Sequence, residues 1–96
     1  MYASIRRYTG VDPSLWDHLH QLRPGLETAF DQVTGFRFWF LVRTDEGLTT
    51  VTLCDDQAGA EASVQVAALW SQDTIPDLIS GKPIVSNGDV ALQIGD

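Results

Sequence analysis

Residues 36–43 form a strongly apolar run, Phe-Arg-Phe-Trp-Phe-Leu-Val-Arg, in a chain of 96 residues. Its aromatic and β-branched content favours a β-strand, in which successive side chains point to opposite faces of the sheet. On one face we expect apolar side chains at every second position, namely Phe36, Phe38, Phe40 and Val42. The other face would carry Trp39 and Leu41, which are also large and apolar. A strand with one face in water alternates more cleanly, so both faces of this sheet are predicted to be covered.

The chain before this run predicts a strand and then a helix. Tyr2–Tyr8 is rich in aromatic and β-branched residues, which favours a strand. Asp12 and Pro13 are typical of a helix start, as a side-chain acceptor followed by a proline in the first turn. Apolar residues then recur at spacings of three and four, which places them on one helical face: Leu15, Leu19, Leu22, Leu26 and Phe30. Because an interior proline costs a helix about 3 kcal/mol, we expect a kink or a break near Pro24. Gly35 would end the helix.

The chain after the run predicts a hairpin and a second helix. Residues 44–47 form a turn with a glycine, and Leu48–Cys54 is rich in β-branched residues, so the two strands are predicted to pair antiparallel. Asp55 or Asp56 would cap the next helix. The apolar face predicted for that helix consists of Ala58, Ala62, Val66, Leu69 and Trp70.

The last quarter of the chain is less regular. Residues 75–81 are turn-prone, and strand material follows at residues 84–85 and 90–94. Asn87-Gly88 lies between these two pieces and would either close a small hairpin or bulge a single strand.

The predicted order of elements is β-α-β-β-α-β over residues 1–96, taken as a single domain. This order is typical of an α+β, ferredoxin-like fold, in which one four-stranded antiparallel sheet carries both helices on one face. The helices would leave the second apolar face of residues 36–43 uncovered. A contiguous apolar patch is uncommon on a monomer, so we expect two copies to pair sheet to sheet as a C2 homodimer.

Charge and cysteine content restrict the partners. The 13 acidic and 6 basic residues give a net charge of −7, which disfavours binding to nucleic acid and to anionic membranes. No apolar stretch approaches the length of about 20 residues that a membrane span needs. Cys54 stands alone, so it cannot form an internal disulfide, and it fits a reducing compartment. We therefore expect a cytoplasmic protein.

The pattern as a whole resembles the dimeric α+β barrel superfamily, and within it the antibiotic biosynthesis monooxygenase-like domains. The resemblance covers nearly the whole chain. The matching features are the opening strand Tyr2–Tyr8, Gly10 before the helix start at Asp12-Pro13, Thr34-Gly35-Phe36 at the second strand, and the stretch from Leu53 to Ser63 with Ala68-Leu69-Trp70 beyond it. The resemblance implies a homodimer whose two sheets close into a barrel, with a hydrophobic pocket between each sheet and its own helices.

Proteins of that superfamily include cofactor-free oxygenases of polycyclic aromatics, haem-degrading enzymes and proteins without a known activity. The haem-degrading branch uses an asparagine in the first strand and a histidine in the second helix. This chain has no asparagine in residues 2–8 and no histidine after His20, so no catalytic residue can be transferred and no cofactor is expected.

Candidate metal ligands are few. His18 and His20 are two residues apart on the predicted first helix, whereas two histidines of one helix bind a metal at spacings of three or four. With Cys54 alone, a zinc site is disfavoured as well, and we expect no metal.

The candidate ligand-binding residues are mostly aromatic. Tryptophan offers a large apolar surface and one N–H donor, which suits flat aromatic ligands as well as cores and interfaces. The residues predicted to line a pocket are Trp70, Trp39, Phe38 and Arg37, and the candidate catalytic residues are His18, as a proton acceptor, and Tyr8. Arg6, Arg7 and Arg37 would either face a ligand anion or form surface ion pairs.

Three functions stay open at this point. The first is a dimeric barrel that binds a small hydrophobic or aromatic ligand, or whose pocket is filled by its own side chains. The second is a cofactor-independent monooxygenase acting on an aromatic substrate. The third is a structural interaction partner, for which no residue argues.

Overall fold

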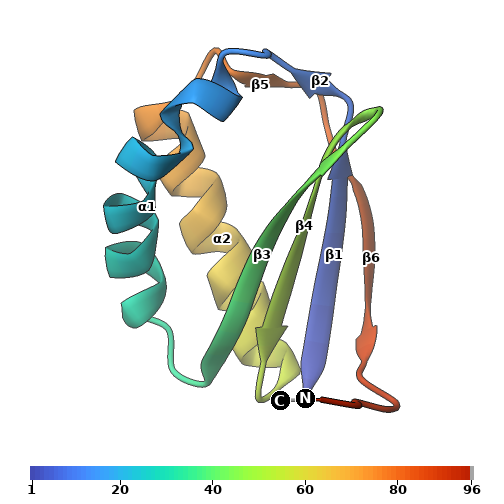
Figure 1. Cartoon of the computed structure of the whole chain (residues 1–96). Coiled ribbons are helices and arrows are strands. Elements are labelled where there is room, and N and C mark those ends of the chain that lie inside the picture. The colour runs from blue at the N-terminus through green and yellow to red at the C-terminus, as the bar shows by residue number, and fades with distance from the viewer. Residues whose placement is uncertain (96) are drawn as a thin grey trace.

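The computed structural model describes residues 1–95 and contains one four-stranded antiparallel sheet with two helices on the same face (Figure 1). The sheet order is β3-β4-β1-β6, and two short strands, β2 and β5, pair beside it. The elements are β1 (Tyr2–Tyr8), β2 (Gly10–Val11), α1 (Leu15–Asp31), β3 (Phe36–Thr44), β4 (Gly47–Cys54), α2 (Gln57–Thr74), β5 (Ile79–Ser80) and β6 (Ile84–Asp89). The predicted ferredoxin-like β-α-β-β-α-β fold is confirmed.

A β-bulge at Arg37 divides the faces of β3 differently from the prediction. Phe36 pairs with Cys54, whereas Phe38 pairs with the adjacent residue, Leu53. Because the extra residue in a bulge shifts the alternation by one position, Phe36 faces the helices and stacks on Phe30 at a ring-centroid distance of 4.7 Å. The prediction that Phe36 shares a face with Phe38, Phe40 and Val42 is therefore wrong. The latter three lie on the face away from the helices.

The face away from the helices, here called the outer face, is apolar in the isolated chain. Phe38, Phe40 and Val42 are 48%, 49% and 46% exposed, and Ile5 on the neighbouring strand β1 is 39% exposed. In contrast, β4 alternates regularly, with Leu48, Thr50, Thr52 and Cys54 buried toward the helices. The sheet thus has one buried and one exposed face, and both carry apolar side chains.

Helix α1 is continuous through Pro24, so the expected break at this residue is absent. It begins at Leu15 with Ser14 as the N-cap residue, two positions later than the prediction from Pro13. The backbone N–H of Ser14 donates to the Asp12 side chain at 2.9 Å, and this bond lowers the pKa of the Asp12 carboxyl below its usual value. Any stability from this bond is present above the ordinary pKa of an aspartate and is lost as the pH falls through the lowered pKa.

Helix α2 packs on the sheet through small residues, and the predicted apolar face is confirmed only for Val66 and Trp70, which are half-buried. Gly59, Ala60 and Ser63 are its buried residues, whereas Ala58, Ala62 and Leu69 are exposed. The Ser63 hydroxyl lies 3.3 Å from the buried Cys54 thiol. Small side chains let the helix backbone approach the strands closely. The predicted cap is confirmed at Asp56, whose carboxylate accepts from the Gly59 N–H at 2.8 Å.

The last strand also differs from the prediction. β6 runs from Ile84 through Asn87-Gly88 to Asp89 and pairs with β1 without a hairpin, and residues 90–94 are not a strand. In this last segment Leu92 and Ile94 are 78% and 91% exposed. The turn-prone segment 75–81 contains β5, which the sequence did not predict.

Candidate functional site

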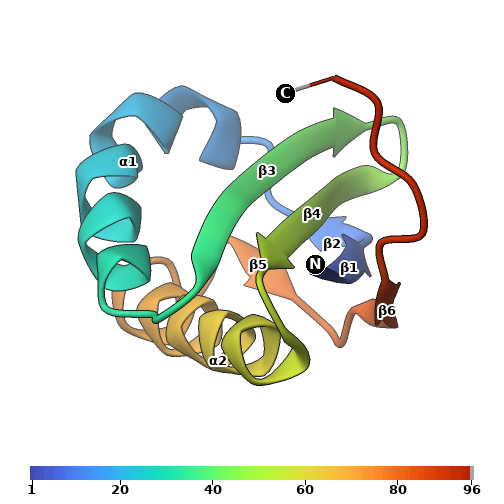
Figure 2. The ribbon, with the colours of Figure 1, turned by 90° about the horizontal axis from the view of Figure 1, so that it is seen from below.

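The two helices contact the sheet to different extents. α2 packs along β1 and β4, whereas α1 packs mainly on α2 and curves away from the sheet in the view of Figure 2. Helix α1 is held at its two ends: Leu15 packs with the buried Leu48 and Ile75, and Phe30 packs on Phe36 and Trp39. Between these two ends, Leu19, Leu22 and Leu26 of α1 border a cavity.

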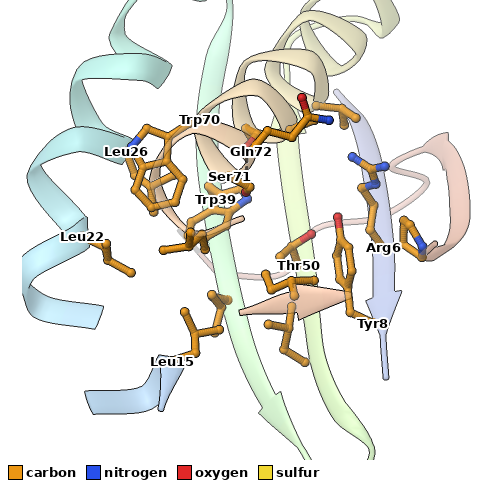
Figure 3. Close-up of a pocket in the computed structure, with 18 of the residues that line it drawn as sticks. Arg6, Tyr8, Leu15, Leu22, Leu26, Trp39, Thr50, Trp70, Ser71 and Gln72 are labelled. Atoms are coloured by element: carbon orange, nitrogen blue, oxygen red, sulfur yellow. Dashed lines mark hydrogen bonds between the residues drawn. The ribbon is translucent and has the colours of Figure 1, made fainter. Parts of the chain in front are cut away.

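This cavity has a volume of about 310 Å³ and lies between the helices and the inner face of the sheet (Figure 3). Most of its lining is apolar. The larger apolar side chains in the lining are Leu15, Leu19, Leu22, Leu26, Trp39, Leu41, Leu48, Val64, Trp70, Ile75 and Ile79. A volume of this size is within the range of small-molecule sites.

Two tryptophans from different elements line the cavity. Trp39 is on β3, and Trp70 is near the end of α2 (Figure 3). Trp70 comes close to the backbone of α1 at Gly25, where an added Cβ atom would lie 2.9 Å from the indole Nε1. Gly25 therefore leaves room for the indole ring, which explains why a glycine is found in the middle of this helix.

The polar end of the cavity is formed by β1 and β4. Arg6 and Tyr8 extend side by side from β1, with the guanidinium carbon 5.9 Å from the centre of the Tyr8 ring, and Thr50 lies nearby on β4 (Figure 3). Arg6 is opposite Thr50 in the register, and Tyr8 is opposite Leu48. One face of two adjacent strands thus presents a guanidinium and hydroxyl groups to an otherwise apolar space.

The structure brings together only part of the predicted site. Tyr8, Trp39 and Trp70 line the cavity, whereas Phe38 is on the outer face and Arg37 forms an exposed ion pair with Asp55 at 2.5 Å. His18 is exposed on α1 and does not line the cavity. The bulge at Arg37 places Phe38 on the wrong face for a pocket residue.

The sequence predicted the apolar stripe of α1 and left Arg6 between two roles, but neither was assigned to the site. The alternation of Leu48, Thr50 and Thr52 indicated which face of β4 is buried, but only the register of the sheet shows that Arg6 lies beside Thr50 on that face.

No group of three or more His, Cys, Asp or Glu side chains that could hold a metal ion occurs among residues 1–95. Over the same residues, no helix has both the length and the apolarity to cross a membrane.

The substitution Gly25→Ala tests the contact with Trp70. Alanine in place of glycine in a helix interior ordinarily stabilises by about 1 kcal/mol. Here we expect no such gain, since the new methyl group must displace the indole into the cavity, and the near-UV circular dichroism of the tryptophans should change. Urea denaturation measures the free energy of unfolding. Gly88→Ala is the control, because an added Cβ there meets nothing within 4 Å. If Gly25→Ala raises the free energy of unfolding by the full difference in helix propensity and leaves the near-UV spectrum unchanged, the close contact between Gly25 and Trp70 is contradicted.

Comparison with known proteins identifies the fold. No family model and no curated protein matches the sequence. Solved structures do match, and they show that the chain has the fold of antibiotic biosynthesis monooxygenase-like proteins.

Three of these structures illustrate the range. The haem degrader MhuD from Mycobacterium tuberculosis, solved with two haems in its active site, is 17% identical with a TM-score of 0.69 over 99% of this chain and 100% of that one. SnoaB, a cofactor-independent oxygenase from Streptomyces nogalater, is 14% identical with a TM-score of 0.67 over 99% and 97% of the two chains. A protein of unknown function from Nitrosomonas europaea is 16% identical with a TM-score of 0.67 over 99% and 92%. At these identities the likeness establishes the fold and leaves the activity open.

Proposed function

We propose that this protein binds a small, mainly apolar aromatic ligand in the cavity between the helices and the sheet. The observation that carries the proposal is a cavity of about 310 Å³ that is lined by Trp39, Trp70 and other apolar side chains, with Arg6, Tyr8 and Thr50 as polar groups. Ligand sites are typically concave and largely apolar, with a small number of polar groups that orient the ligand. Flat rings stack or pack edge-on against indoles, so an aromatic ligand fits these walls best.

The cavity wall offers a direct test through Ala68 on α2, which lines the cavity. Ala68→Phe should fill part of the space and weaken binding of a naphthalene probe, 2-naphthalenemethanol, by at least about tenfold, because the probe and the new ring cannot occupy the same volume. Isothermal titration calorimetry measures the affinity. Ala62→Phe on the same helix is the matched control, since Ala62 is exposed and outside the cavity lining. Equal affinities for the two variants would reject the cavity as the binding site.

We further infer that the protein is a homodimer that pairs through the outer face. The support is the apolar surface formed by Ile5, Phe38, Phe40 and Val42, which is large for a protein surface left in water. Such pairing would bury the outer faces of both sheets, so that each sheet is covered by its own helices on one side and by the partner sheet on the other.

A cofactor-independent monooxygenase is the second candidate. It is favoured by Arg6 and the Tyr8 hydroxyl, which lie at one end of an apolar cavity where they can stabilise the enolate or phenolate of a substrate. Among residues 1–95 the lining contains no histidine, aspartate or glutamate, and His18 is exposed, so the substrate itself must be acidic enough to lose the proton. For an anthrone, the ionised methylene carbon reacts with O2, and the products are the quinone and one water.

Oxygen uptake with 1,8-dihydroxyanthrone separates the two candidates. Quinone formation above the uncatalysed rate, lowered by Tyr8→Phe while probe binding is retained, would support the oxygenase. If quinone forms no faster with the protein than in buffer alone, the oxygenase is rejected and ligand binding without turnover remains the proposed function.

Haem matches the residues of this cavity less well than a small aromatic ligand does. Its lining among residues 1–95 holds no histidine, cysteine or methionine that could ligate iron. We therefore derive no reaction through haem for this chain.

A further inference from the structure

Arg6 is the one charged side chain among the described residues that line the cavity. Residues 1–95 form two ion pairs, Arg23–Glu27 and Arg37–Asp55, and neither includes Arg6. Of the six basic residues, four form no ion pair within residues 1–95, so Arg6 is set apart by its position and not by the lack of a carboxylate partner. Arg6 lies on the inner face of the central strand β1, with Tyr8 beside it, at the polar end of the cavity.

The guanidinium is also incompletely hydrogen bonded. The Nε atom of Arg6 is buried and has no hydrogen-bond partner among residues 1–95. Arg6 also borders a second hollow, of about 260 Å³, whose lining includes Glu61. The Glu61 carboxylate accepts a hydrogen bond from the Gln57 amide at 3.0 Å and forms no ion pair with Arg6. The Arg6 side chain as a whole is half-buried, but a buried donor without an acceptor is costly. An anion bound in the cavity would supply the guanidinium with an acceptor.

We propose that the cavity selects an anionic aromatic ligand, and that Arg6 binds its carboxylate or phenolate oxygen while the tryptophan walls hold the ring. The proposal rests on the ligand-binding function above and specifies the class of ligand. A guanidinium donates two parallel N–H bonds to a carboxylate, and these charge-assisted bonds are stronger than those between neutral groups. Tyr8, which extends next to Arg6, adds a hydroxyl that can donate to the same anion.

Two probes of nearly the same shape test the proposal, 2-naphthoate and neutral 2-naphthalenemethanol, with affinities measured by isothermal titration calorimetry. The wild-type protein should bind the carboxylate about tenfold more tightly or better, since a hydrogen bond to a charged group is stronger than one between neutral groups. Arg6→Gln should abolish this preference by weakening naphthoate binding alone. Arg6→Lys keeps the charge without the planar fork and should retain part of the preference.

Arg23→Gln is the matched control, because it removes the same charge from a side chain that is 77% exposed on α1 and outside the cavity lining. It should retain the full preference. Equal affinities of the wild type for the two probes, or a preference that survives in Arg6→Gln, would overturn the anion proposal while leaving ligand binding in place. Failure of both probes to bind the wild type would overturn the ligand-binding function as well. The wild-type comparison holds even if Arg6→Gln does not fold.

Discussion

Phe40→Glu is expected to convert the protein into a monomer. Phe40 lies in the middle of the exposed strand β3, flanked by Phe38 and Val42, and its ring centre is 6.1 Å from that of Phe38. In the proposed dimer the substitution removes two buried phenylalanine side chains, each worth about 1.5–3 kcal/mol, and buries two carboxylates in their place. The dissociation constant should rise at least about a thousandfold. Sedimentation velocity at micromolar concentration measures it.

Leu69→Glu is the control for this experiment. Leu69 is 62% exposed, but it lies on α2, on the opposite side of the sheet from Phe40. The same change of charge and polarity there should leave the dimer intact. A wild-type protein that sediments as a monomer, or a Phe40→Glu variant as dimeric as the wild type, would reject pairing through the outer face.

Leu48→Ala is expected to lower the free energy of unfolding by about 2–5 kcal/mol, because it deletes a core side chain at a site that cannot collapse. Leu48 is 1% exposed and forms the buried cluster with Leu15 and Ile75 that anchors the first turn of α1. For a domain of this size the melting temperature should fall by about 10 °C or more. Without the Leu48 side chain, the start of α1 should be held less firmly on the sheet, and the backbone amide hydrogens of its first turns should exchange faster.

Leu92→Ala provides the comparison, since Leu92 is 78% exposed in the last segment of the chain. In the isolated chain this substitution should change stability by no more than about 0.5 kcal/mol. Equal losses in the two variants, measured at one protein concentration, would contradict the assignment of the core to the Leu48 cluster.

The sequence was sufficient for the order and type of the main elements. Clear signals marked each one: the alternation in Tyr2–Tyr8, the three- and four-residue spacing from Leu15 to Phe30, and the aspartate cap at Asp56. These are local properties, set by backbone periodicity and by hydrogen bonds within a few residues. The family resemblance, which rested on the same elements, is confirmed for the fold.

Which face of a strand or helix is buried was harder to predict than where the element lies. The two-residue periodicity of a strand placed Phe36 on the same face as Phe38, but one extra residue, the bulge at Arg37, reversed the alternation. On α2 the apolar residues Ala62 and Leu69 suggested the buried face, whereas the helix turns its small residues to the sheet to approach it closely. In each case the outcome depends on packing between elements, of β3 against β4 and of α2 against the strands that it covers.

The candidate site divides in the same way. Tyr8, Trp39 and Trp70 could be named from their chemistry, and the structure places them around the cavity. His18 directly precedes Leu19 of the apolar stripe of α1, and the spacing alone did not say whether its side chain faces the cavity; in the structure it is exposed and outside the lining.

The sequence by itself determined the succession of strands and helices and the presence of apolar side chains on both faces of β3, because periodicity and capping act over a few residues. Only the tertiary structure decided that the helices and the sheet enclose a cavity, and that Arg6 lines it without an ion pair among residues 1–95. Both outcomes depend on how strands and helices far apart in the chain pack together, and a local sequence pattern carries no information about that packing.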